Sequence, residues 1–204
     1  MLQYYKQCVL ENPPTKNELF VSAFNQAIKG IYHDEINNND IFKEFLSYSK
    51  KFRYLEADEM FHPISLSHPV LEPLLCSLDV DSVSMNYTIK GFPQCDTKSA
   101  FAQNVKEIQF NNGSIRELGQ SIGNFSKLEE LSLREHNISE LPKSFKKLQT
   151  LKKLDLTGNK FDAIPESLYK LPNLEELKIT IKSMESKKKF EQIQPSVSLD
   201  ITYW

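Results

Sequence analysis

Histidine and cysteine side chains often bind zinc or act in covalent catalysis, and this sequence has four histidines and three cysteines. The histidines, His33, His62, His68 and His136, form no HExxH pair, and no two cysteines stand in a CxxC pair. Structural zinc sites use closely spaced ligand pairs, and covalent catalysis needs a nucleophile beside a base. The sequence therefore predicts no catalytic residue, no metal site and no enzyme activity.

Glycine-rich loops that hold phosphate groups are also missing from the sequence. It contains six glycines, and none of them forms a GxGxxG or GxxxxGK motif. Such loops need glycine because the backbone must approach the phosphate closely. We therefore expect no nucleotide and no other cofactor.

The cysteines and the first residues indicate the compartment. Cys8, Cys76 and Cys95 are odd in number and widely spread, which favours a reducing compartment over a disulfide framework. The start, "MLQYYKQCVLENPP", does not read as a signal peptide. We therefore expect a cytoplasmic protein, with non-classical export left open. On this reading four N-x-[ST] sequons arise by chance; they begin at Asn86, Asn112, Asn124 and Asn137.

The charge and hydrophobicity of the chain limit its partners. Its 25 Lys and Arg residues stand against 27 Asp and Glu residues, which gives a formal net charge of −2. Proteins that bind nucleic acid usually carry a basic surface that neutralises phosphates. A membrane-spanning helix needs a run of about 18 apolar residues, and no stretch approaches that length. The sequence therefore predicts neither a nucleic-acid partner nor a membrane span.

A regular repeat dominates the second half of the chain. Val105, Leu128, Leu151 and Leu174 begin four copies, so the repeat period is 23. With each start as position 1, apolar residues recur at positions 4, 6, 11, 14, 18 and 21. Together with the starts, the apolar residues of the first three copies are Val105, Ile108, Phe110, Ile115, Leu118, Ile122, Phe125; Leu128, Leu131, Leu133, Ile138, Leu141, Phe145, Leu148; and Leu151, Leu154, Leu156, Phe161, Ile164, Leu168, Leu171.

The spacing within a copy predicts its local structure. Positions 4 and 6 lie on one face of a strand, whereas positions 14, 18 and 21 have the spacing of a helical or 3₁₀ segment. At position 9, Asn159 can bond backbone groups in the bend between them, and His136 and Gly113 occupy this position in the preceding copies. We interpret His136 as a substitute for asparagine rather than as a functional ring. Pro142 and Pro165 fit the turn into the second segment.

The pattern LxxLxLxxNxLxxLPxxLxxLxx resembles the leucine-rich repeat family, most clearly over residues 105–179. This resemblance implies an α/β fold, a short right-handed solenoid with a parallel sheet on its concave face. It also implies that the concave face binds a protein partner. One copy alone cannot bury its apolar residues, so neighbouring copies must stack to form the core.

The ends of the array are less regular. We expect a degenerate copy at 80–104, copies at 105–127, 128–150, 151–173 and 174–195, and a terminal strand at about 197–203, which gives six strands. We interpret Lys187 to Lys189 as a solvated loop. Residues 78–204 would thus form the repeat domain.

Residues 1–77 differ in character from the repeats. The stretches 15–31 and 40–52 have apolar residues at helical spacing behind plausible N-caps, which predicts two amphipathic helices. Residues 56–77 contain three prolines and predict an irregular connector with at most a short helix at "VLEPLLCSL". We expect residues 1–77 to be a helical N-terminal cap.

The candidate binding residues follow from the resemblance and from the strand spacing. If positions 1, 4 and 6 face the core, then positions 3, 5, 7 and 8 face outward and are free of the packing constraint. The residues predicted to contact a partner are Glu107, Gln109, Asn111, Glu130, Ser132, Arg134, Lys153, Asp155, Thr157, Glu176, Lys178 and Thr180.

Two functions remain open at this stage. The first is a non-enzymatic interaction module or scaffold that binds a protein through the concave face. The second is a regulator or effector whose activity lies in the N-terminal helical region, with the repeats as a targeting arm. The sequence leaves the identity of the partner and the oligomeric state open.

Overall fold

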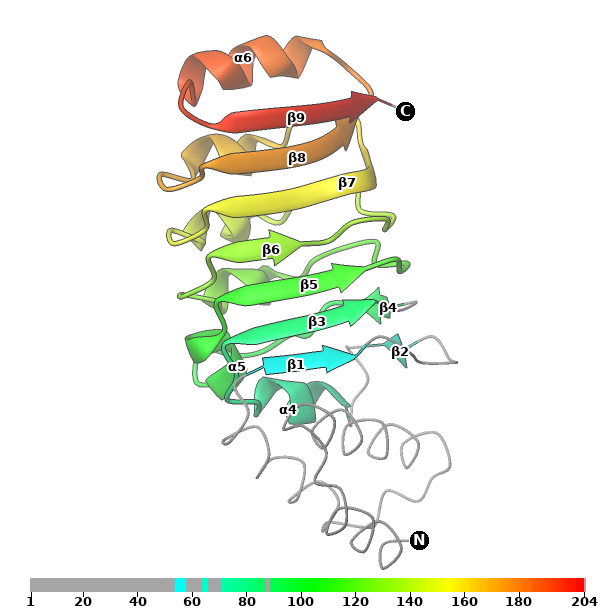
Figure 1. The fold of residues 1–204 in the computed structure, drawn as a ribbon, viewed down its shortest axis with the longest axis vertical. Helices are drawn as coiled ribbons and strands as arrows, with labels where there is room; N and C mark the ends of the chain where they lie inside the picture. Colours follow the sequence, from blue (N-terminus) through cyan, green and yellow to red (C-terminus); the bar gives the residue numbers. More distant parts are fainter. Residues whose placement is uncertain (1–53, 58–63, 66–70, 87–88, 204) are drawn as a thin grey trace, which may run out of the picture.

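A parallel sheet forms one side of the molecule (Figure 1). The structure is a computed structural model that describes residues 54–57, 64–65, 71–86 and 89–203. The seven strands lie in the order β1-β3-β5-β6-β7-β8-β9, and every neighbouring pair is parallel. The strands are β1 (Tyr54–Ala57), β3 (Ser82–Asn86), β5 (Glu107–Asn111), β6 (Glu130–Ser132), β7 (Lys153–Phe161), β8 (Glu176–Ile181) and β9 (Ser198–Tyr203).

The strand register reproduces the sequence repeat. Glu107 of β5 pairs with Glu130 of β6, and Glu130 pairs with Lys153 of β7. Lys153 pairs in turn with Glu176 of β8, so each partner lies one repeat period further along the chain. Equivalent positions of successive copies therefore lie side by side. The strand expected in the degenerate first copy is present as β3, and the expected terminal strand is present as β9.

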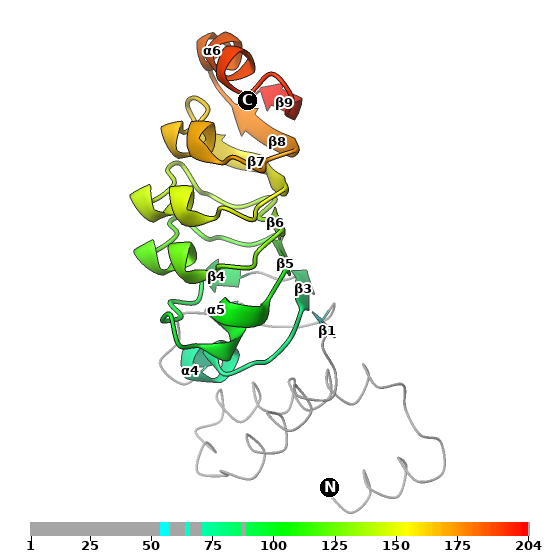
Figure 2. The same ribbon diagram turned by 90° about the vertical axis from the view of Figure 1, so that its left-hand side faces the viewer.

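Short helices lie on the other side of the sheet, as Figure 2 shows. The three clear copies supply 3₁₀ helices η1 (Gln120–Asn124), η2 (Lys143–Lys147) and η3 (Glu166–Lys170), which confirms the predicted second segment. Pro142 and Pro165 are the residues just before η2 and η3, where the fixed φ of proline suits the turn. Further short elements are α4 (Leu71–Cys76), α5 (Ala100–Asn104), α6 (Glu185–Ile193) and the two-stranded pair of β2 (Ile64–Ser65) and β4 (Ile89–Gly91).

The core lies between the strands and these helices. Leu154 and Leu156 of β7 are at most 1% exposed, and Leu168 of η3 is 0% exposed. Of the 21 apolar residues of the repeat, all but Leu141 are buried, and Leu141 packs against the core. The alternation along β5, with Ile108 and Phe110 buried between half-buried neighbours, confirms which side of the sheet faces inward.

Two segments differ from the prediction. The sheet has seven described strands rather than six, because β1, which overlaps the first two residues of the stretch expected to be an irregular connector, pairs with β3. The short helix expected in that stretch is present as α4. Lys187 to Lys189 belong to the helix α6 rather than to a loop, because Phe190 anchors that helix in the core. The helices predicted within 15–31 and 40–52 lie outside the described residues.

Cys76 and Cys95 form a disulfide, so the expectation of unpaired cysteines is wrong. Their Cα atoms are 5.2 Å apart, although the residues are 19 positions apart in the sequence. Cys76 ends α4, and Cys95 lies in the segment between β4 and α5. The degenerate first copy brings these two segments together, and this proximity is not visible from the spacing of the cysteines alone.

Asn159 and His136 have equivalent bonds at position 9. Asn159 Oδ1 accepts from the Ile138 N–H at 3.1 Å, and Asn159 Nδ2 donates to the Leu133 carbonyl at 2.6 Å. One copy earlier, His136 Nδ1 accepts from the Ile115 N–H at 3.4 Å, and His136 Nε2 lies 2.8 Å from the Phe110 carbonyl. The ring thus reaches the equivalent backbone groups of the preceding copy. His136 substitutes for asparagine, as predicted.

Candidate functional site

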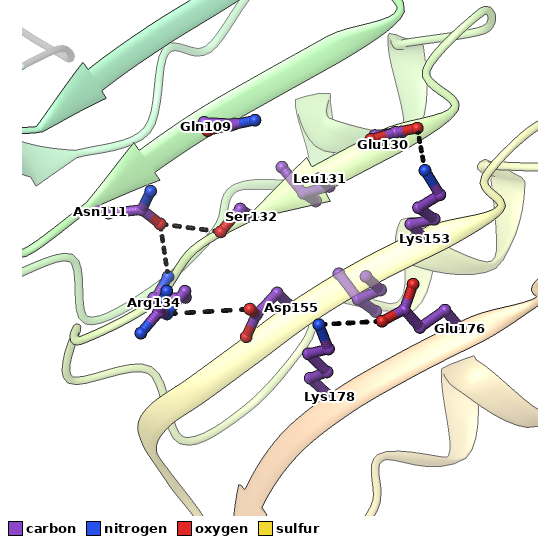
Figure 3. A pocket seen from close by; sticks show the side chains of 11 residues that line it. Gln109, Asn111, Glu130, Leu131, Ser132, Arg134, Lys153, Asp155, Glu176 and Lys178 are labelled. Carbon is purple, nitrogen blue, oxygen red and sulfur yellow. Dashed lines mark hydrogen bonds and ion pairs between the residues drawn. The ribbon is translucent and has the colours of Figure 1, made fainter. Parts of the chain in front are cut away.

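A polar hollow of about 280 Å³ opens on the face of the sheet away from the helices, and Figure 3 shows the side chains around it. We call this face the open face; it corresponds to the face predicted to be concave. The hollow lies over β5, β6, β7 and β8. It is lined by Gln109, Asn111, Glu130, Leu131, Ser132, Arg134, Lys153, Leu154, Asp155, Glu176 and Lys178.

Two lysine–glutamate pairs lie along the hollow. Lys153 Nζ is 2.7 Å from a carboxylate oxygen of Glu130 on the neighbouring strand, and Lys178 Nζ is 2.9 Å from Glu176 on its own strand. The hydrogen bond from Lys153 to Glu130 raises the pKa of Lys153, and the bond to Glu176 does the same for Lys178. Both lysine side chains are about half exposed to solvent, so these pairs orient the side chains and contribute little to stability.

Arg134 is held more loosely than the two lysines. Its Nε lies 3.8 Å from Asp155 Oδ2, and about half of its side chain is exposed. The other oxygen of Asp155, Oδ1, accepts from the backbone N–H of Thr157 at 2.9 Å and from the Thr157 hydroxyl. These bonds fix Asp155 against its own strand, so the carboxylate cannot turn both oxygens toward the guanidinium.

Asn111 connects β5 to β6 and to the segment that follows it. Its Oδ1 accepts from the Ser132 hydroxyl at 2.8 Å and from the backbone N–H of Arg134 at 3.1 Å. Gln109, two residues earlier on the same strand, donates to Glu107. The amide side chains of the hollow are therefore oriented by contacts within the open face.

Nine of the twelve predicted binding residues line the hollow, and three do not. Glu107 lies at its margin, where it accepts from Ser82 and Gln109. Thr157 supports Asp155. Thr180 is 6% exposed, and its hydroxyl accepts from the Gly158 N–H at 2.8 Å, so it serves the backbone rather than the surface.

Sequence reasoning missed two features of this face. Leu131 and Leu154, at the inward position 4, also border the hollow, although both residues are at most 2% exposed. At position 8, Asn112, Glu135 and Gly158 have φ values of 59°, 56° and 73°, in the left-handed region. In these three copies position 8 therefore turns the chain away from the sheet instead of extending the open face, and in the fourth copy Ile181 at this position is buried in β8. The glycine and asparagine at this position were the available signal, because both tolerate positive φ.

The chemistry of the hollow suits recognition. Its charged groups alternate in sign and are hydrogen-bonded or ion-paired to one another, which is an arrangement that complements a polar ligand. Among the residues that the structure describes, no group of three His, Cys, Asp or Glu side chains could hold a metal ion. The described helices include none that is long and apolar enough to cross a bilayer.

Comparisons with known proteins agree with this architecture. The model of the leucine rich repeat family matches residues 126–180. The solved structure of a leucine-rich repeat protein from Leptospira interrogans is similar, with a TM-score of 0.51 at 18% identity, over 78% of this chain and 46% of that one. The similarity therefore spans less than half of that protein, and at this identity it shows the fold alone. No curated protein matches the sequence.

Proposed function

Because this chain carries leucine-rich repeats, which generally mediate protein–protein interaction, we propose that it is a non-enzymatic module that binds a protein through its open face. The observation that carries this proposal is the polar hollow over four neighbouring strands. Strands lie about 4.8 Å apart, so β5 to β8 span roughly 15 Å. A surface of this width suits an extended segment or one element of a partner.

The contacts among the side chains of the hollow support this function. Its side chains project from paired strands, and contacts such as Glu130–Lys153 and Asn111–Ser132 hold them in place before a ligand arrives. A preorganised surface loses less side-chain entropy on binding than a mobile one. The alternating charges would favour partners with the complementary arrangement and disfavour others, because an unmatched charge in an interface is costly.

A protein is the partner class that fits the charge. The chain has a formal net charge of −2, and the hollow itself contains three acidic and three basic side chains, Glu130, Asp155, Glu176 and Arg134, Lys153, Lys178. This balance does not favour the phosphate backbone of a nucleic acid. The cytoplasmic location stays a prediction, and the Cys76–Cys95 disulfide favours an oxidising compartment instead.

Charge reversal tests the open face. The variant Arg134→Glu, Asp155→Lys and Lys178→Glu inverts three central charges while leaving the buried positions untouched. We expect it to lose a partner that the wild-type chain captures from its native cells, with an unchanged melting temperature. A matched control reverses Lys143, Lys146 and Glu166 on η2 and η3, on the other side of the sheet. If the open-face variant retains the partner and the control loses it, binding occurs on the helical side.

The alternative, an N-terminal effector region with the repeats as a targeting arm, concerns residues that lie mainly outside the described part. It stays a prediction. Expressing residues 1–77 alone and assaying partner capture separates it from the proposal above.

A further inference from the structure

At the end of the hollow near the C-terminal ends of β5 and β6, more hydrogen-bond donors than acceptors are without a partner among the described residues. Asn111 and Arg134 occupy position 7 of neighbouring copies, so they lie on adjacent strands or their continuations. Both side chains line the hollow (Figure 3). The balance of their donors and acceptors indicates which chemical group this end of the hollow would bind.

The orientation of the Asn111 amide follows from its partners. The backbone N–H of Arg134 can only donate, so the Asn111 atom 3.1 Å away must be the oxygen. The same oxygen accepts from the Ser132 hydroxyl at 2.8 Å. The amide nitrogen Nδ2 is the other end of this group, and it has no acceptor among the described residues. Asn111 therefore presents an unused donor at the surface.

Arg134 has unused donors as well. The guanidinium has five N–H groups, and its only ion pair in the described part of the chain is through Nε, at 3.8 Å from Asp155. The two terminal nitrogens make no other ion pair there. The backbone around this side chain is fixed, because Arg134 N donates to Asn111 and Arg134 O accepts from the Asn112 N–H at 3.0 Å. A planar fork on a fixed backbone matches the two oxygens of a carboxylate.

Two of the acceptor atoms nearby are already in use. Asp155 Oδ1 receives two bonds from Thr157, and Asn111 Oδ1 receives two from Ser132 and Arg134. An incoming donor such as a lysine would find only Asp155 Oδ2 open, which lies 3.8 Å from Arg134 Nε, whereas an incoming acceptor would find the unused donors of both Arg134 and Asn111.

We propose that Arg134 and Asn111 form a subsite for the side-chain carboxylate of an aspartate or glutamate in the partner protein. Arg134 would bind the carboxylate with its terminal nitrogens, and Asn111 Nδ2 would add a neutral donor. The hollow is open across four strands, which suits a partner chain that passes over it rather than one that ends in it. This inference rests on the proposed function and names the chemistry of its partner.

Asp155 is the competitor of the incoming carboxylate. Asp155 is the only acidic residue that pairs with Arg134 among the described residues. The distance of 3.8 Å between Arg134 Nε and Asp155 Oδ2 leaves this pair weak. Asp155→Asn keeps an oxygen that can accept from Thr157 and removes the negative charge. We therefore expect this variant to bind an acidic peptide more tightly than the wild-type chain does.

The test uses the full chain and three acetylated peptides. The probes are acetyl-Gly-Glu-Gly-amide, its glutamine counterpart, and acetyl-Gly-Gly-Gly with a free C-terminal carboxylate. Binding is followed by NMR at the Arg134 Nε–H and Asn111 Nδ2–H signals. We expect saturable shifts with the glutamate peptide, and binding at least about tenfold weaker for the glutamine peptide, since charged hydrogen bonds contribute more than neutral ones.

Variants assign the subsite. Arg134→Gln should weaken binding of the glutamate peptide by about tenfold, and Asn111→Ala should weaken it by a smaller factor. Lys143→Gln on η2 should leave the affinity unchanged. Equal binding of the glutamate and glutamine peptides, or an unchanged affinity in Arg134→Gln, would overturn the proposal. Tighter binding of the peptide with the free C-terminus would overturn the assignment to a side-chain carboxylate.

These outcomes are distinct from failure of the proposed function. If the charge-reversal variant loses the captured partner while the glutamate peptide shows no preference for Arg134, the open face binds protein and the subsite is wrong. If the peptide binds at Arg134 but the captured partner is retained by the charge-reversal variant, the subsite stands and the partner binds elsewhere.

Discussion

At the scale of single residues, position 9 shows one structural task carried out by two side chains. Asn159 is 1% exposed and joins three backbone groups, those of Ile138, Leu133 and Leu156. His136 is 3% exposed and reaches the equivalent of two of them. Burial makes these bonds important, because a backbone group left without a partner in the core costs free energy.

We expect Asn159→Ala to lower the free energy of unfolding by about 3 kcal/mol, because the substitution leaves the Ile138 N–H and the Leu133 carbonyl unpaired in the core. Denaturant unfolding followed by circular dichroism measures the change. Asn173→Ala is the matched control, since Asn173 is exposed and donates only to the Gln149 carbonyl. Equal losses in the two variants would show that the position 9 bonds have no special weight.

His136 makes stability depend on pH. Burial lowers the pKa of His136 below its usual 6.5, although the bonds to backbone groups and the nearby Glu135 oppose this shift. The unfolded chain therefore takes up a proton at a higher pH than the folded chain does. Stability should be complete above pH 6.5 and should fall as the pH drops below it, by at most about 1.4 kcal/mol per pH unit.

His136→Asn isolates this effect. Asparagine does not titrate, and Asn159 shows that it can make the same bonds at this position. We expect the variant to be as stable as the wild-type chain at pH 8 and more stable at pH 5, as measured by urea unfolding. An identical pH profile for both chains would contradict the role given to His136.

At the scale of the elements, a disulfide joins the irregular first copy to the helix that precedes it. The offset between β3 and β5 is longer than the repeat period, as the pair Ser82–Glu107 shows. The bond from Cys76 to Cys95 links α4, which precedes this copy, to the segment between β4 and α5 within it. Four phenylalanines of the same core cluster contact one another, with ring centroids 5.5 to 5.8 Å apart: Phe92, Phe101, Phe110 and Phe125.

We expect Cys76→Ser with Cys95→Ser to lower the free energy of unfolding by about 3 kcal/mol, because the closed loop of 19 residues restricts the unfolded chain. Thermal unfolding with and without reductant measures the effect. Thiol titration of the denatured, unreduced wild-type chain should find one free thiol, that of Cys8. Three free thiols would show that the bond does not form in the purified protein.

At the scale of the whole molecule, stacking makes each copy depend on its neighbours. β7 has a strand on both sides, whereas β9 pairs only with β8 in the described residues. Leu199 and Ile201 of β9 are half-buried, and their equivalents Leu177 and Ile179 are at most 1% exposed. In such arrays local stability follows the number of neighbouring copies.

We expect amide hydrogen exchange to be slowest in β5 to β8 and clearly faster in β9. Opening β9 breaks one set of strand contacts, whereas opening β7 breaks two. Hydrogen–deuterium exchange with mass spectrometry measures this order, and the overlapping peptides around Leu154 serve as the internal reference. Equal protection of β7 and β9 would indicate that the array opens as one unit.

The repeat itself can be read from the sequence, because each buried position recurs with the same period and parallel stacking turns that period into register. Spacing alone assigns Leu151, Leu154, Leu156 and Leu168 to their sides of the copy. The same spacing predicts most of the residues that line the hollow, since positions 3, 5 and 7 are those that packing does not constrain.

Spacing could not supply contacts between residues that follow no period. The pairing of Cys76 with Cys95, the addition of β1 to the sheet and the burial of Thr180 depend on how irregular segments fold back in space. The loose hold of Asp155 on Arg134 and the free donor of Asn111 are likewise matters of distance and hydrogen-bond direction. The sequence pattern indicates which residues face outward, but only the tertiary structure shows which of their side chains already have hydrogen-bond or ion-pair partners.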